Sequence, residues 1–123
     1  MVRRIVYWGP TALVGLGLIA ALSYLTGNEE VVSGFAKAGY PPHLRIVLGL
    51  AKPAAGLVIL LPGLVLLKEW AYAGATFTWT MATIAHYVSG DGVKVWSLPL
   101  TMLILLAVSY FTRPANRRLP QRA

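Results

Sequence analysis

Cysteine is absent from this 123-residue chain, and acidic residues are scarce. The absence of thiols excludes disulfide bonds, thiol redox relays and metal sites built from thiolates. Only four residues are acidic against eleven lysines and arginines, which gives a formal net charge of +7. These basic residues gather toward the chain ends instead of forming a stripe on one face, so the charge does not indicate nucleic-acid binding.

Charged residues of either sign are also few. They make up 12% of the sequence, whereas apolar residues make up 57% and the mean hydropathy is +0.65. A soluble domain of this size could not bury so much apolar surface in a single core. The composition therefore predicts a single membrane domain over residues 1–123, located in the cell membrane.

Four apolar stretches each approach the length of about 20 residues that crosses about 30 Å of hydrocarbon as a helix. They cover residues 5–25, 44–61, 70–87 and 95–111. Continuous apolar runs exclude the alternating pattern of a membrane barrel. The predicted fold class is thus all-α, a multi-pass transmembrane four-helix bundle. A cleaved signal peptide is the alternative for the first stretch, although its apolar region exceeds the usual length of about 7 to 15 residues.

The lysines and arginines outside the apolar stretches predict an orientation, because the side richer in them faces the cytoplasm. One side carries Arg3, Arg4, Lys68, Arg113, Arg117, Arg118 and Arg122, and the other carries Lys37, Arg45 and Lys94. Both termini are therefore predicted to be cytoplasmic. The long connection over residues 26–43 forms either a short interfacial helix over residues 31–38 or a solvated loop.

Lys52 and Pro53 interrupt the second apolar stretch in the segment GLAKPAAG. A lysine at the centre of a spanning helix costs about 2.5 to 3.5 kcal/mol on insertion scales, so it normally faces protein or trapped water. Pro53 removes one helical N–H and frees a carbonyl near Gly49. We expect either a specific site around Lys52 or a lysine whose side chain reaches the interface alone.

The third apolar stretch carries polar and aromatic residues at helical spacing, which places them on one face. They are Thr76, Trp79, Thr80, Thr83, His86 and Tyr87. With Lys52 at a comparable depth, this face predicts a polar ligand-binding pocket that opens toward the outside. The alternative is that each threonine hydroxyl bonds to a carbonyl of its own helix.

The sequence contains few residues that could bind a metal or a redox cofactor. The two histidines, His43 and His86, lack the spacing of a metal or haem site, and the sequence has no flavin or iron–sulfur motif. Lys68 and Glu69, like Pro53, are expected to have structural roles. Glu69 is expected to cap the third helix and to pair with Lys68 or a nearby arginine. No pattern assigns a catalytic residue, so the sequence leaves enzyme activity open.

Five segments resemble the DoxX-like family of small four-helix membrane proteins. They are GYPPHL at 39–44, GLAKPAAGLVILLPG at 49–63, LKEWAYAG at 67–74, His86 with the later Gly90-Asp91, and SYFTRP at 109–114. The resemblance implies that Lys52, Glu69 and His86 occupy the positions of the family's motif lysine, acid and histidine. Pro53 departs from the family pattern, in which an aliphatic residue follows the lysine.

The resemblance also implies association with redox enzymes, because some DoxX relatives are subunits of quinone-linked oxidoreductases and others are linked to oxidative-stress complexes. We therefore expect an accessory or quinone-interacting subunit of a membrane redox assembly. Its partners would be the bilayer and another membrane protein or redox subunit, and quinone is the candidate cofactor. Two alternatives stand: a transporter or binding protein for a small or lipid-like molecule, and a structural membrane scaffold without catalysis.

Overall fold

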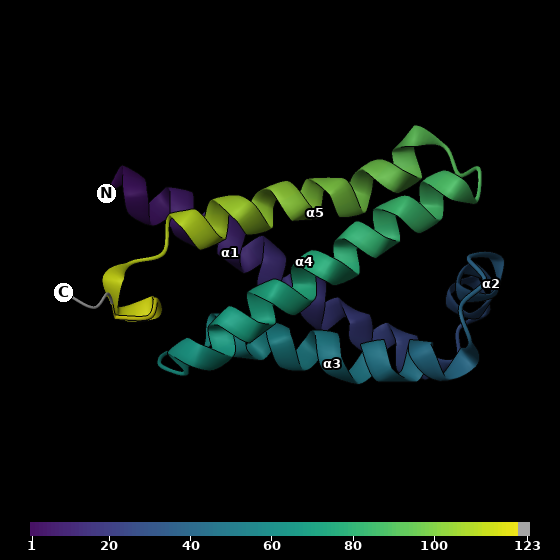
Figure 1. The fold of residues 1–123 in the computed structure, drawn as a ribbon, viewed down its shortest axis with the longest axis horizontal. Coiled ribbons are helices and arrows are strands. Elements are labelled where there is room, and N and C mark those ends of the chain that lie inside the picture. The colour runs from purple at the N-terminus through teal and green to yellow at the C-terminus, as the bar shows by residue number, and fades with distance from the viewer. Residues whose placement is uncertain (121–123) are drawn as a thin grey trace.

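The computed structural model describes residues 1–120, and these residues form helices and short connections (Figure 1). The α-helices are α1 Val2–Ile19, α2 Glu29–Lys37, α3 Pro42–Leu60, α4 Val65–Val88 and α5 Val93–Phe111. Two 3₁₀ helices follow α1 and α5, namely η1 (Ala20–Thr26) and η2 (Ala115–Arg117). No strand occurs within residues 1–120, which confirms the predicted all-α fold class.

Helix α1 together with η1, and helices α3, α4 and α5, cover the four predicted apolar stretches to within one residue. Three of them are long and apolar enough to cross a membrane: α1 together with η1, α3, and α5. The fourth, α4, is 24 residues long but is not among these candidates. Its polar content explains this, because it includes Lys68, Glu69 and four threonines. The chain is thus a membrane protein with three candidate spanning helices in the described part.

The long helices contact one another in cyclic order, α1 with α3, α3 with α4, α4 with α5, and α5 with α1. The buried core that they share consists of Val14, Leu18, Ile59, Ala71, Tyr72, Ala75, Trp79 and Leu106. Helices α1 and α3 cross closely, since a Cβ atom on Gly56 would lie 2.8 Å from the carbonyl oxygen of Gly15. Such small residues at crossings are typical of helices that pack in membranes.

Large apolar side chains cover the outside of the helices. Every long helix contributes some, among them Leu16, Leu57, Phe77, Leu98 and Phe111. Contiguous apolar surface on this scale is rare in soluble monomers and is favourable against acyl chains. The distribution of side chains therefore agrees with a membrane environment.

The predicted helix in the long connection is confirmed as α2, which begins at Glu29. The side chain of Asn28 accepts a hydrogen bond from the backbone N–H of Glu30 at 2.8 Å and caps its N-terminus. After the helix, Gly39 has a φ of 81° and reverses the chain toward α3. The connection is therefore an ordered helix across one end of the molecule and not a solvated loop.

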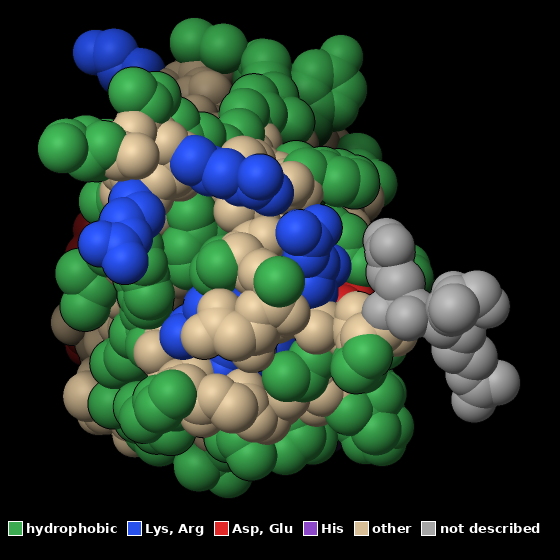
Figure 2. Space-filling view, turned by 90° about the vertical axis from the view of Figure 1, so that its left-hand side faces the viewer, with side chains coloured by type: hydrophobic (Ala, Val, Ile, Leu, Met, Phe, Trp, Pro, Cys, Tyr) green, Lys and Arg blue, Asp and Glu red, His purple; other side chains and the backbone are tan. Residues whose placement is uncertain are grey.

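The N-terminus and η2 lie at the same end of the molecule, together with the turn between α3 and α4 (Figure 1). We call this the terminal end and the opposite one the α2 end. The basic residues at the terminal end are Arg3, Arg4, Lys68, Arg113, Arg117 and Arg118, and Figure 2 shows lysine and arginine side chains gathered there. Arg122, the seventh residue of this predicted set, lies outside the described residues.

Candidate functional site

Lys52 lies in the middle of α3 and is buried, with 8% of its surface exposed. Its ammonium nitrogen is 3.3 Å from the hydroxyl of Tyr24 in η1. It also lies 5.2 Å from the centre of the Tyr24 ring and 5.7 Å from that of Trp79 in α4. The charge is therefore held between two aromatic rings, an arrangement that stabilises a cation by about 0.5 to 2 kcal/mol.

The position of Tyr24 depends on a glycine one turn before Lys52. A Cβ atom on Gly49 would lie 2.7 Å from Leu25 Cδ2 and 3.2 Å from Tyr24 Cβ, so the glycine leaves room for η1 to lie close to α3. The side chain of Arg45 donates a hydrogen bond to the carbonyl of Tyr24 and ties the two helices together. Pro53, also buried, has no N–H to donate to the carbonyl of Gly49. Gly49 and Arg45 therefore hold Tyr24 beside Lys52.

A groove with a volume of about 290 Å³ runs between α3 and α4 beside Lys52. Small residues open it, namely Ala51, Ala54, Ala55, Ala71, Gly74 and Ala75. Leu67 and Trp70 form its wall toward the terminal end, and Lys52 and Thr78 are its polar side chains. The site is thus mostly apolar, which corrects the prediction of a polar pocket, and no residue of α2 lines it.

The predicted polar face of α4 does not surround Lys52. Thr76, Thr80 and Thr83 each donate a hydrogen bond to the carbonyl four residues earlier, at 2.7, 2.7 and 2.8 Å. Of the two alternatives given for these threonines, the structure shows the second, in which each hydroxyl bonds to a carbonyl of its own helix and none bonds to the Lys52 ammonium. Tyr87 is 69% exposed and lies edge-on to Trp96. Of the six predicted residues on this face, Trp79 is the one in contact with Lys52.

His86 belongs to a separate cluster at the α2 end. Its Nδ1 lies 2.7 Å from one carboxylate oxygen of Asp91, and the other oxygen accepts a hydrogen bond from Lys37 of α2. The hydrogen bonds from Lys37 and His86 hold the pKa of Asp91 below its usual value. This cluster joins α2 to the turn between α4 and α5, and it places the imidazole away from the groove at Lys52.

Glu69 lies at the terminal end and forms an ion pair, as predicted. The sequence analysis left open whether Lys68 or a nearby arginine was the partner, and the structure shows Arg113. A guanidinium nitrogen of Arg113 donates to one carboxylate oxygen, and the hydroxyl of Tyr110 donates to the other at 2.8 Å. The guanidinium of Arg113 also lies 3.8 Å from the centre of the Tyr110 ring. The expectation that Glu69 caps its helix is wrong, because α4 begins at Val65 and has no acid in its first turn.

Two cations cap the C-terminus of α3, and the sequence analysis did not find this arrangement. Lys68 is fully buried and donates to three carbonyls, of Val58 at 2.6 Å, of Gly63 at 2.8 Å, and of Leu61. Arg117 donates to the carbonyls of Ile59, Leu60 and Leu61 at 2.7, 3.0 and 3.1 Å. The last carbonyls of a helix lack partners and carry negative partial charge, so cations are stabilising there. A lysine five residues after the Pro-Gly break was the available signal.

Comparison with protein families places most of the sequence in a known group. The family model described as the DoxX-like family matches residues 10–109. The chain belongs to the DoxX-like family. Comparison with curated proteins and with solved structures gives no match. The region that matches this DoxX-like family contains Lys52, Glu69 and His86, whereas Arg4, Arg113 and Arg117 lie outside it.

Proposed function

We propose that this DoxX-like protein binds a lipid-soluble molecule with an oxygen acceptor in the groove at Lys52, and that the molecule is a quinone. A buried ammonium at the edge of an apolar groove supports this proposal. A flat quinone ring suits apolar walls, and its carbonyl oxygen can accept a hydrogen bond from Lys52. The groove volume of about 290 Å³ suits a ring whose isoprenoid tail continues into the lipid.

The two buried lysines differ in how their hydrogen-bond donors are used. An ammonium has three donors, and Lys68 directs them to three carbonyls. Lys52 has one hydrogen bond within residues 1–120, the long one to Tyr24. All three donors of Lys68 are therefore used within the protein. Lys52 keeps donors for a ligand, which is the observation that carries the proposal.

We further infer that α4 crosses the membrane beside the three candidate spans, so that the chain forms a four-helix bundle. Helix α4 contacts α3 and α5 and extends from the terminal end to the α2 end (Figure 1). An even number of crossings agrees with the N-terminus and η2 lying at one end. The six basic residues described at the terminal end support a cytoplasmic location for it.

The proposed biological setting is an accessory subunit of a membrane redox assembly. A chain without cysteine or a haem, flavin or iron–sulfur motif needs a partner subunit for electron transfer. In this setting Lys52 and the aromatic side chains beside it would bind and orient the quinone, while the partner would carry the electrons.

The test is extraction in mild detergent, followed by mass spectrometry of the lipids and proteins that co-purify. We expect quinone with the wild-type protein, its loss from Lys52→Met, and its retention in Lys94→Met. Lys94 is exposed in α5, so this control makes the same chemical change outside the groove. A Gly74→Leu variant tests whether the quinone occupies the groove, because the added side chain would enter open space there.

The same co-purification experiment, with a flux assay in proteoliposomes, distinguishes quinone binding from the transporter and scaffold alternatives. Equal amounts of quinone in wild type and Lys52→Met would contradict the proposal. A different small molecule that Lys52→Met loses, with ligand flux in proteoliposomes that lack any redox partner, would identify a transporter or binding protein. Retention of every protein partner by Lys52→Met, with no ligand in either sample, would identify a scaffold.

A further inference from the structure

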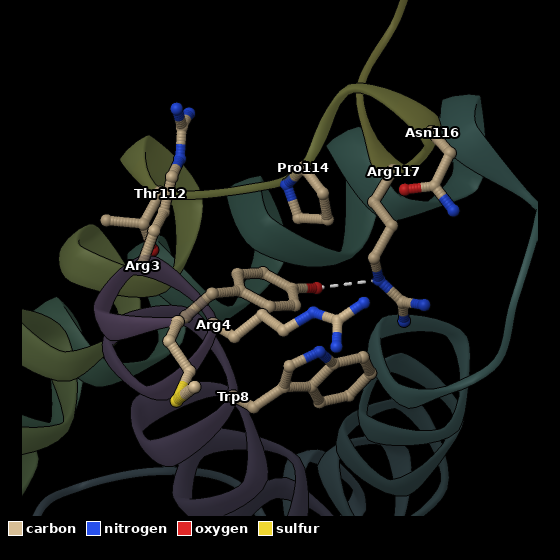
Figure 3. Close-up of a pocket in the computed structure, with 9 residues that line it drawn as sticks. Arg3, Arg4, Trp8, Thr112, Pro114, Asn116 and Arg117 are labelled. Atoms are coloured by element: carbon tan, nitrogen blue, oxygen red, sulfur yellow. Dashed lines mark hydrogen bonds between the residues drawn. The ribbon is translucent and has the colours of Figure 1, made fainter.

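A second cavity lies at the terminal end, between the start of α1 and the segment that follows α5 (Figure 3). Its volume is about 340 Å³. Three arginines line it, Arg3, Arg4 and Arg117, together with Tyr7, Trp8 and Asn116. No acidic side chain belongs to this lining, so the cavity is strongly positive.

The acids of the chain do not neutralise these arginines. The sequence has four acids, and three of them, Glu29, Glu30 and Asp91, lie at the α2 end. The fourth is Glu69, whose ion pair is with Arg113. Within residues 1–120 the arginines of the cavity therefore have no carboxylate partner.

Arg117 is held rigidly at the inner wall of this cavity. It is 6% exposed, its Nε donates to the Tyr7 hydroxyl at 2.7 Å, and one terminal nitrogen, Nη2, is hydrogen-bonded to the end of α3. Its guanidinium carbon lies 4.8 Å from the centre of the Trp8 ring. The remaining terminal nitrogen, Nη1, has no hydrogen-bond partner among the described residues and keeps its donors.

The side chain of Arg4 extends across the cavity toward the guanidinium of Arg117, whereas Arg3 points away (Figure 3). Two guanidinium groups that line one cavity without a carboxylate repel each other, and an anion bound by both removes this repulsion. The planar fork of Arg4 can donate two parallel hydrogen bonds to phosphate oxygens, and Arg117 keeps the donors of its Nη1 for the same group. The arrangement therefore has the charge and the donors of a phosphate site.

We propose that this cavity binds the phosphate group of an anionic phospholipid, which Arg4 and Arg117 hold through hydrogen bonds. The cavity lies at the end of α1, a candidate spanning helix, where Val2 and Ile5 are exposed and can contact an acyl chain. Tryptophan and arginine at the end of a spanning helix lie at headgroup level, as Trp8 and Arg4 would. A lipid therefore accounts for both the charge and the apolar surface beside it.

The test is native mass spectrometry of the full chain in neutral detergent, titrated with phosphatidylglycerol, phosphatidylcholine or inorganic phosphate. We expect phosphatidylglycerol to bind the wild type most tightly and Arg4→Gln to weaken it about tenfold, as for loss of a charge-assisted hydrogen bond. Arg4 is exposed, so its replacement should not affect folding. Arg118→Gln is the matched control, since it removes the same charge at the same end but does not line the cavity. It should keep wild-type affinity within about twofold.

Three results would overturn the proposal. Equal losses in Arg4→Gln and Arg118→Gln would mean that the end attracts lipid by diffuse charge without a site. Equal binding of phosphatidylcholine and phosphatidylglycerol would remove the requirement for an anion. Inorganic phosphate that displaces phosphatidylglycerol at equal concentration would identify a free-phosphate site in place of a lipid site.

Discussion

Individual residues show how this chain places positive charge among apolar helices. Arg113 pairs with Glu69, Arg117 binds the last carbonyls of α3, and Lys52 lies between Tyr24 and Trp79. A lysine at the centre of a spanning helix costs about 2.5 to 3.5 kcal/mol on insertion scales, and a cation over aromatic rings gains about 0.5 to 2 kcal/mol. For Lys52 the two aromatic rings and the hydrogen bond to the Tyr24 hydroxyl therefore offset part of this cost.

Lys68→Met is expected to destabilise the protein by about 2 to 4 kcal/mol, because three part-buried carbonyls lose a charged donor and, of these, only that of Leu61 keeps Arg117 as a partner. The affected carbonyls belong to Val58, Leu61 and Gly63. Thermal unfolding in detergent measures this change. Lys94→Met, at an exposed position, serves as the control and should keep the wild-type midpoint. An unchanged midpoint for Lys68→Met would mean that Arg117 alone is sufficient to cap α3.

The residues of the site divide into those that sequence reasoning can reach and those that it cannot. The burial of Lys52 was predictable, because a charge exposed to lipid is costly. Its contact with Trp79 was predictable, because the helical period of α4 places Trp79 on the face that turns toward the other helices. Tyr24 was not, because its place depends on the closeness of η1 to Gly49 across 25 residues of chain. The pairing of Arg117 with Tyr7 depends likewise on segments at opposite ends of the sequence.

At the scale of helices, the lengths of the apolar runs predicted the four long helices, and the ends agree within five residues when η1 is counted with α1. The largest difference is at the start of α4, at Val65 instead of residue 70. Lys68 and Glu69 extend this helix because each finds a partner inside the protein. A span predicted from hydropathy alone ends at the first charged residues. Hydropathy does not show that these residues have partners in the segments that follow α3 and α5.

Gly56→Ala is expected to separate α1 from α3 and to cost about 1 to 3 kcal/mol, as overpacking of a close contact does. The added methyl group would meet the backbone of Gly15, which has no flexible end that can move away. The unfolding midpoint in detergent measures the effect. Gly9→Ala in α1 is the control, because a Cβ atom there meets nothing within 4 Å and alanine favours the helix. Equal midpoints for the two variants would contradict the close crossing.

At the scale of the whole molecule, the absence of cysteine provides a direct test of orientation. Ser33→Cys places an exposed thiol on α2, and Ala115→Cys places one in η2 at the terminal end. We expect a membrane-impermeant maleimide to label the first in intact cells and the second only after permeabilisation. Labelling of both in intact cells would contradict an arrangement in which the two ends lie on opposite sides of the membrane.

The contact between Arg117 and Tyr7 closes a loop that contains nearly the entire polypeptide. During synthesis, helix α1 therefore enters the bilayer long before the partner of Tyr7 exists. The second cap of α3 is likewise missing until residue 117 has left the ribosome. We therefore expect the terminal end to be the last part to mature, so that a polypeptide released before that residue would leave α3 incompletely capped and its Tyr7 hydroxyl unpaired.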